Sequence, residues 1–95
     1  MTKVYAVYSI YSYESTILKG IFLNKEDAKE LAKVLEDTSS CDYTRIEEAT
    51  TKYPHCDMYL VSVDGFDGDI SDSYKLTVEE AKRTEGKVKS FAIRN

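Results

Sequence analysis

The chain has 95 residues, enough for one domain with its own hydrophobic core but not for two. Hydrophobic residues make up 42% of it, so it is not a disordered segment. Against 13 basic side chains stand 17 acidic ones, and the net charge of −4 disfavours binding of duplex DNA by the whole surface.

No apolar run approaches the roughly 20 residues of a membrane span, and no secretory signal is visible after Met1. We therefore expect a cytoplasmic protein that does not bind membranes. Cys41 and Cys56 are expected to be reduced thiols, because disulfides are rare in that compartment.

Two apolar runs predict two strands, from about Lys3 to Tyr11 and from about Ser15 to Leu23. The first run has apolar side chains on both faces, as an inner strand has. Gly20 in the second run predicts a bulge or a close backbone approach. The link between the runs lacks the signature of a tight hairpin turn, so their pairing register stays open.

A helix is predicted to begin at Asn24, which is a strong N-cap residue, and to end near Glu36 or Asp37. Its apolar residues recur at helical spacing and form one stripe that can pack on a sheet. The stripe consists of Ala28, Leu31, Ala32 and Leu35.

The segment from Tyr43 to Thr50 fits either a polar edge strand or a short helix, and its β-branched residues favour the strand. Pro54 is expected to close this segment. Met58 to Val63 reads as a core strand, and Asp64 to Asp69 as a turn or loop.

Thr77 and Glu80 match a capping box, which predicts a helix of about two turns that ends near Gly86. Val88 to Ile93 reads as the last strand. The predicted class is α+β, with strand and helix order β-β-α-(β)-β-α-β. We expect a single, mainly antiparallel sheet with the first helix packed on one face.

The start of the chain resembles that of many small uncharacterised proteins from phages and Gram-positive mobile elements. The resemblance rests on Val4-Tyr5-x-Val7, Ile17-x-x-Gly20-Ile21-Phe22 and Lys25-Glu26-x-Ala28, which cover about the first third of the chain. It implies a phage or mobile-element accessory protein in the host cell cytoplasm. Many such proteins bind and alter one host protein, including defence nucleases and transcription factors.

Aspartates are concentrated between Asp64 and Asp72, and carboxylates are the ligands that Ca²⁺ and Mg²⁺ prefer. The spacing does not fit the calcium loop of an EF-hand, so we expect no metal site. An acidic docking loop with Phe66 as an apolar anchor is favoured. The alternative is that Phe66 folds back into the core.

Cys41, His55 and Cys56 are the residues that could supply a nucleophile or zinc ligands. His55 and Cys56 are neighbours, which a strand would place on opposite faces, and a tight Cys-x-x-Cys pair is absent. We expect Cys56 to pack at the start of a core strand and His55 to lie on the surface. The sequence therefore predicts no enzyme activity and no cofactor.

Tyrosine is unusually frequent, with 8 residues against 3 phenylalanines. If the first helix covers the face that contains Val4 and Tyr8, then Tyr5, Tyr11 and Tyr13 form an exposed row on the other face. Such a row beside acidic segments resembles the stacked rings and phosphates of a nucleic acid. The alternative is that the helix over residues 78–85 covers that face and buries the rings.

Charge is segregated along the chain. Residues 26–48 hold eight acids and three bases, residues 57–72 hold five acids and no base, and residues 73–95 hold six bases and three acids. A basic protein surface is the natural partner of the acidic segments. In the last segment, Lys87 and Lys89 are expected to protect an edge strand from aggregation.

The sequence therefore predicts a small acidic interaction protein that inhibits or redirects a host protein, for example a nucleic-acid-binding or defence protein. A protein that binds or sequesters a nucleotide is the alternative, and both a monomer and a homodimer are compatible with the sequence. The residues expected to bind the partner are Glu47, Glu48, Asp64, Phe66, Asp67, Asp69, Asp72, Tyr11 and Tyr13.

Overall fold

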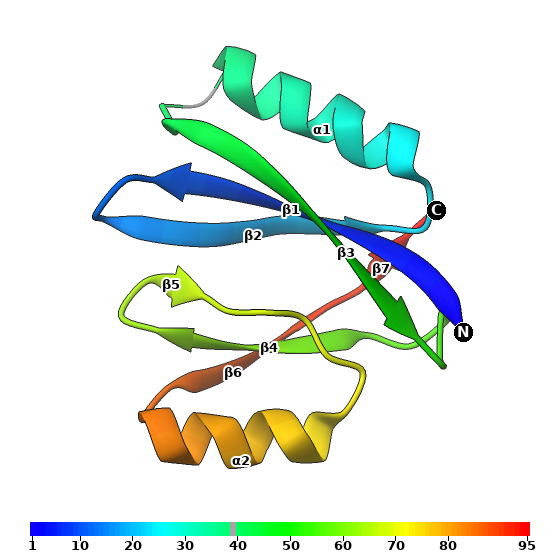
Figure 1. Ribbon diagram of the computed structural model, residues 1–95, viewed down its shortest axis with the longest axis vertical. Helices are drawn as coiled ribbons and strands as arrows, with labels where there is room; N and C mark the ends of the chain where they lie inside the picture. Colours follow the sequence, from blue (N-terminus) through cyan, green and yellow to red (C-terminus); the bar gives the residue numbers. More distant parts are fainter. Residues whose placement is uncertain (39) are drawn as a thin grey trace.

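Figure 1 shows the computed structural model of the protein, which describes residues 1–38 and 40–95. The strands in this part of the chain form one mixed, mainly antiparallel sheet, and α1 packs against it, which confirms the predicted α+β class. The elements are β1 (Thr2–Tyr11), β2 (Ser15–Phe22), α1 (Lys25–Thr38), β3 (Tyr43–Thr51), β4 (Met58–Val63), β5 (Phe66–Asp67), α2 (Tyr74–Thr84), β6 (Lys87–Phe91) and β7 (Ile93–Arg94).

β1 is an inner strand, as predicted, with β2 on one side and β3 on the other. The register of β1 with β2 shifts after Val7, which faces Gly20, and Lys19 is the extra residue in β2. The irregularity expected at Gly20 is therefore a bulge. A close approach is present as well, because a Cβ atom on Gly20 would lie 3.1 Å from the ring of Phe22.

The segment that the sequence left open between strand and helix is a strand. It forms β3, which pairs with β1 along its whole length and lies at one edge of the sheet. The β-branched residues that favoured a strand thus predict the structure correctly.

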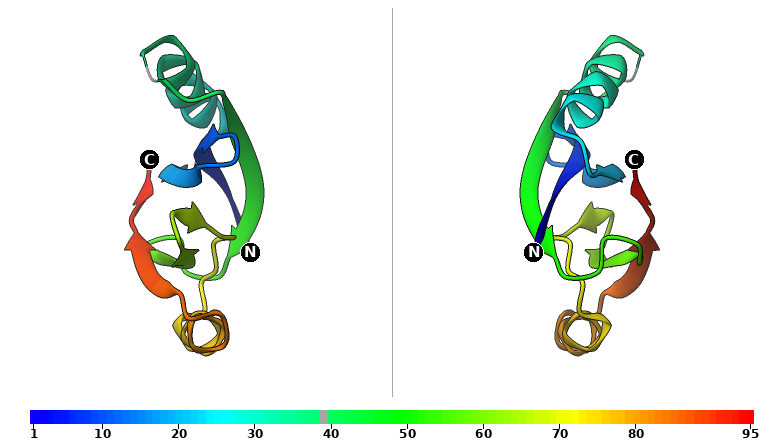
Figure 2. Two further views of the ribbon diagram at one scale, coloured as in Figure 1. Left: turned by 90° about the vertical axis from the view of Figure 1, so that its left-hand side faces the viewer. Right: turned by 90° about the vertical axis from the view of Figure 1, so that its right-hand side faces the viewer.

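β2 has a different parallel partner at each of its ends: Thr16 pairs with Phe66 of β5, and Ile21 pairs with Ile93 of β7. β4 lies between β5 and β6, and β7 follows β6 after a break at Ala92. The second half of the chain therefore joins β2 twice: β5 pairs near the start of β2, and β7 pairs near its end. Figure 2 shows β3 and the β6–β7 segment on opposite sides of the molecule.

Two hydrophobic clusters pack around β1, and one of them lies under α1. The cluster under α1 contains Val7, Phe22 and Ala28, with Tyr5 packed against it. α1 thus covers the face of Tyr5, not the face of Tyr8, so the exposed row of tyrosines is not formed. The other cluster consists of Val4, Ala6, Tyr8, Ile10, Leu18, Ile21, Met58 and Leu60.

α2 lies at the opposite end of the molecule from α1 and packs against β4 and β6, not over Tyr5 (Figure 1). The predicted start at Thr77 is wrong, because the hydroxyl of Ser73 is the N-cap and accepts the N–H of Leu76 at 3.4 Å. Thr77 is buried inside the first turn, where its hydroxyl donates to the carbonyl oxygen of Ser73. The earlier start lets Tyr74 pack edge to face on Tyr59 of β4.

Candidate functional site

Three connections meet at one end of the sheet: the β1–β2 turn, the start of β3 and the β4–β5 turn (Figure 1). The carboxylate of Asp42 accepts the backbone N–H of Ser12 at 2.6 Å, which joins the first two. The N–H of Thr16 donates to the carbonyl oxygen of Gly65 at 3.1 Å, which joins the first and the third. Segments far apart in the sequence are therefore held side by side.

Each of these connections presents an aromatic ring and a carboxylate. The side chain of Tyr13 is fully exposed, and Tyr43 and Phe66 are 53% and 44% exposed. The rings and acids of this surface, which we call the turn end, are Tyr13, Glu14, Asp42, Tyr43, Asp64 and Phe66. Phe66 does not fold back into the core, so its predicted exposure is confirmed.

Tyr13 adopts a backbone conformation that tyrosine rarely takes. Its φ is +65°, in the left-handed region, where a side chain other than that of glycine, asparagine or aspartate costs roughly 1–2 kcal/mol. The turn is closed by the N–H of Glu14, which donates to the carbonyl oxygen of Tyr11 at 2.9 Å. Because its ring lies in solvent, Tyr13 adds nothing to the core that would offset this cost.

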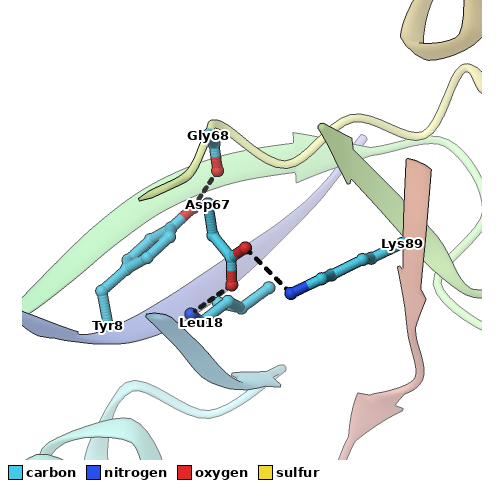
Figure 3. A network of polar contacts seen from close by, with 5 residues as sticks. All are labelled: Tyr8, Leu18, Asp67, Gly68 and Lys89. Atoms are coloured by element: carbon cyan, nitrogen blue, oxygen red, sulfur yellow. Dashed lines mark hydrogen bonds and ion pairs between the residues drawn. The ribbon is translucent and has the colours of Figure 1, made fainter. Parts of the chain in front are cut away.

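The sequence predicted that Asp67 belongs to an exposed docking loop, and this prediction is wrong. Its carboxylate is buried, accepts the N–H of Leu18 at 2.9 Å and lies 3.2 Å from the ammonium of Lys89 (Figure 3). Next to it, the buried hydroxyl of Tyr8 donates to the carbonyl oxygen of Gly68. β5 pairs with β2 at one residue pair only, so no backbone carbonyl of β5 reaches the N–H of Leu18. The carboxylate of Asp67 takes the place of that carbonyl along the seam, which is the line of contact between β2 and β5. Asp67 thus has a structural role.

Asp72 and Glu48 also make contacts within the protein. Asp72 accepts the N–H of Lys52 at 3.0 Å and fastens the loop before α2 to the far end of β3. Glu48 lies 3.2 Å from the ammonium of Lys3, in an exposed ion pair. Neither residue lies at the turn end, so the structure does not bring them together with Tyr13.

Glu47 forms a second polar cluster in the middle of β3. The guanidinium of Arg45 lies 3.0 Å from its carboxylate and 4.8 Å from the centre of the Tyr8 ring. Partial burial raises the pKa of Glu47, Arg45 opposes this, and a hydrogen bond with the carboxyl of Asp69 raises the pKa further. Burial is also the main reason why the pKa of Tyr8 lies well above its ordinary value. The cluster connects β3 to the loop that follows β5.

The prediction from the sequence did not include three members of the candidate site, Glu14, Asp42 and Tyr43. The signal that could have found them is an acid next to an aromatic residue in two connections, Tyr13-Glu14 and Asp42-Tyr43. Tyr11, which was predicted, is half-buried at the end of β1, beside the turn end.

The cysteines lie elsewhere. Cys56 is exposed in a turn before β4, where its N–H donates to the carbonyl oxygen of Tyr53, so the predicted packing of Cys56 in the core is wrong. His55 is exposed, as expected. Among residues 1–38 and 40–95, no group of three or more His, Cys, Asp or Glu side chains is arranged to hold a metal ion. In the same part of the chain, neither helix has the length and apolar character needed to cross a bilayer.

A hollow of about 390 Å³ lies next to the turn end. Its lining contains two lysines, Lys87 and Lys89, and two acids, Asp64 and Glu85. These four charges cancel, and Lys89 already pairs with Asp67. The hollow therefore does not favour an anionic ligand such as a nucleotide.

Comparison with known proteins gives no relative: no protein-family model, no curated protein and no solved structure matches this chain. We therefore infer a function from the geometry of the turn end and from its chemistry.

Proposed function

We propose that the protein is a small interaction protein that binds a partner protein with a basic surface through the turn end, and thereby inhibits or redirects that partner. The observation that carries the proposal is the meeting of three exposed aromatic rings and three carboxylates at one end of the sheet. The three connections that carry them, residues 12–14, 42–43 and 64–66, contain no basic residue.

Aromatic side chains with a few neighbouring polar groups are typical of the residues that dominate binding energy in protein interfaces. Tyr13, Tyr43 and Phe66 can bury large apolar areas at a small cost in side-chain entropy. Glu14, Asp42 and Asp64 surround them with negative charge, which steers a basic partner toward the surface. The rings thus supply affinity, and the acids supply association rate and selectivity.

The turn end is also preorganised. The hydrogen bonds from Ser12 to Asp42 and from Thr16 to Gly65 fix the three connections relative to one another before any partner arrives. A surface that is ordered beforehand loses less conformational entropy on binding. This supports a binding role more strongly than three independent flexible loops would.

The phage or mobile-element origin implied by the resemblance would make the partner a host protein. Nucleic-acid-binding and defence proteins carry basic surfaces that attract phosphates, and the turn end complements such surfaces in charge. We therefore place the target in this class.

The experiment is affinity capture from a host lysate at low and high salt, with the tagged wild type and two variants as bait. Tyr13→Gly removes one ring and relaxes the backbone, because glycine accepts a positive φ. Tyr53→Ala is the matched control, since Tyr53 is 57% exposed but lies in the loop before β4, away from the turn end. We expect a captured protein that is lost with Tyr13→Gly, retained with Tyr53→Ala and weakened by salt.

Equal capture by all three baits would contradict the proposal. So would a specific partner whose binding is unaffected by salt and by the charge reversal Asp64→Lys. If nothing is captured, a thermal-shift screen with nucleotides tests the alternative of a nucleotide-binding protein.

A further inference from the structure

In the described part of the chain the strand order ends at β3 and β6, and neither pairs with a further strand on its outer side; the two-residue β7 pairs only with β2. β3 is the longer of the two, and Figure 2 shows its outer edge along one side of the molecule. An exposed edge presents unpaired N–H and C=O groups and can pair with another chain unless charges prevent it.

The charges on β6 disfavour self-pairing. Lys87 and Lys89 lie on the same face of this strand, and β6 contains no acid. In an antiparallel pair of identical strands, residues directly opposite each other share a face. Axes at Lys87, Val88 and Lys89 each place a lysine directly opposite a lysine of the other copy, which is unfavourable, and since β6 contains no acid, no register within it pairs opposite charges.

The charges on β3 have the opposite character. Arg45 and Glu47 lie on one face, two positions apart, and their side chains are 44% and 37% exposed. A two-fold axis that passes through Ile46 places each Arg45 directly opposite the Glu47 of the other strand. The same register places Tyr43 opposite Ala49, whose small side chain leaves room for a ring.

We propose that two copies of the chain pair along β3, antiparallel and about a two-fold axis at Ile46, so that Arg45 of each copy faces Glu47 of the other. The partner of this edge is thus a second copy, and the two sheets become one continuous sheet.

Neighbouring registers are excluded by like charges. An axis at Arg45 places the two arginines face to face, an axis at Glu47 places two glutamates face to face, and an axis at Glu48 does the same for Glu48. Axes at Thr44 and Ala49 bring no charged residues of β3 opposite each other, whereas the register centred on Ile46 pairs opposite charges at two sites and has no like-charged pair directly opposite. One register of β3 is therefore favoured by its charge pattern, whereas β6 has none.

Arg45 is already positioned for this contact. Its guanidinium is held by the carboxylate of Glu47 at 3.0 Å and by the ring of Tyr8 at 4.8 Å. A guanidinium has five N–H donors, so it can bind a second carboxylate from the other copy without giving up the first. Tyr43 belongs both to the turn end and to β3, whereas the β1–β2 and β4–β5 turns do not belong to β3, and antiparallel pairing points the two turn ends in opposite directions.

The test is the mass of the purified protein by sedimentation equilibrium from about 1 µM to 1 mM, a range in which weak interfaces dissociate. We expect the wild type to reach the mass of a dimer. Arg45→Glu and Glu47→Arg each place like charges across the axis at two sites, so each should raise the dissociation constant at least about tenfold. An equimolar mixture of the two variants should dimerise again, because the two glutamates of one variant then face the two arginines of the other.

Lys87→Glu on the other edge is the matched control and should leave the dimer unchanged. Circular dichroism establishes that each variant is folded. A wild type that stays monomeric at 1 mM, variants that dimerise like the wild type, or a mixture that stays monomeric would each overturn the proposal. So would a change in dimerisation by Lys87→Glu alone.

A cross-link tests the register independently. In a background with Cys41→Ser and Cys56→Ser, Ile46→Cys places two thiols across the axis at a distance that a disulfide can span. We expect oxidation to give a covalent dimer with Ile46→Cys and not with Thr50→Cys. The reverse result would overturn the register. These experiments need no host partner, so their failure would leave the proposed function of the turn end untouched.

Discussion

Replacing Asp67 by alanine removes the side chain that closes the seam between β2 and the second half of the sheet. The Asp67 side chain is 2% exposed, whereas the Lys89 side chain that pairs with it is 47% exposed. The loss therefore has two unequal parts: a buried hydrogen bond to the N–H of Leu18 and a half-exposed ion pair.

The hydrogen bond dominates the cost. A buried N–H that loses its acceptor costs about 1–3 kcal/mol, and the N–H of Leu18 has this bond in a buried position. The ion pair adds up to about 1 kcal/mol, since solvent screens the exposed end of Lys89. Asp67→Ala should thus lower the free energy of unfolding by about 1–4 kcal/mol, out of the roughly 5–15 kcal/mol typical of a native domain.

The assay is urea denaturation of Asp67→Ala, Asp67→Asn and the control Asp64→Asn. The asparagine variant of Asp67 keeps an acceptor for the N–H of Leu18, so its loss of stability should be about half that of the alanine variant. Asp64 is exposed in the turn, and its variant should stay within about 0.5 kcal/mol of the wild type. Equal stability of Asp67→Ala and Asp64→Asn would refute the structural role of Asp67.

Three further predictions concern other parts of the molecule. Tyr13→Gly should leave the free energy of unfolding unchanged or raise it by up to about 1 kcal/mol, measured by urea denaturation, because the left-handed strain is relieved; a clear loss would show that the ring stabilises the fold. Gly86→Ala should destabilise by about 1–3 kcal/mol, since the new Cβ would lie 2.5 Å from Val61 Cγ1; a thermal melt that matches the wild type would contradict this packing. The pKa of Glu47 is higher in the folded protein than in the unfolded chain, so at pH values between the two the folded state binds more protons. The contribution of Glu47 to stability therefore falls as the pH rises through that window. Glu47→Gln should flatten this part of the stability curve, and an unchanged slope would contradict the assignment.

The sequence predicted the elements whose signals are local. Two apolar runs identified β1 and β2, and the N-cap Asn24 marked the start of α1, where its side chain accepts the N–H of Glu26 at 2.8 Å. The start of α2 was missed because the capping box at Thr77 and Glu80 drew the prediction there, whereas Ser73, one turn earlier, is the N-cap. Contact of Tyr74 with β4, which no local pattern encodes, favours the earlier one.

The face that α1 covers and the role of Asp67 depend on contacts between distant segments. Both faces of β1 are apolar, so periodicity alone could not assign α1 to the side of Tyr5. Asp67 stands among other aspartates and reads as part of a solvated loop, yet it is buried against Leu18, 49 residues away in the sequence. The turn end was half predicted for the same reason: Tyr13, Asp64 and Phe66 stand out locally, but their meeting depends on the order of the strands.

Whether the turn end is the binding surface is tested most directly by NMR. Unlabelled partner from the affinity capture is added to the ¹⁵N-labelled protein, and the backbone amide shifts are followed. The proposed function predicts that the largest changes fall on the three connections, residues 12–14, 42–43 and 64–66, while α1, α2 and residues 52–57 change little. Changes concentrated on α2 or on residues 52–57, with the turn end unaffected, would contradict it.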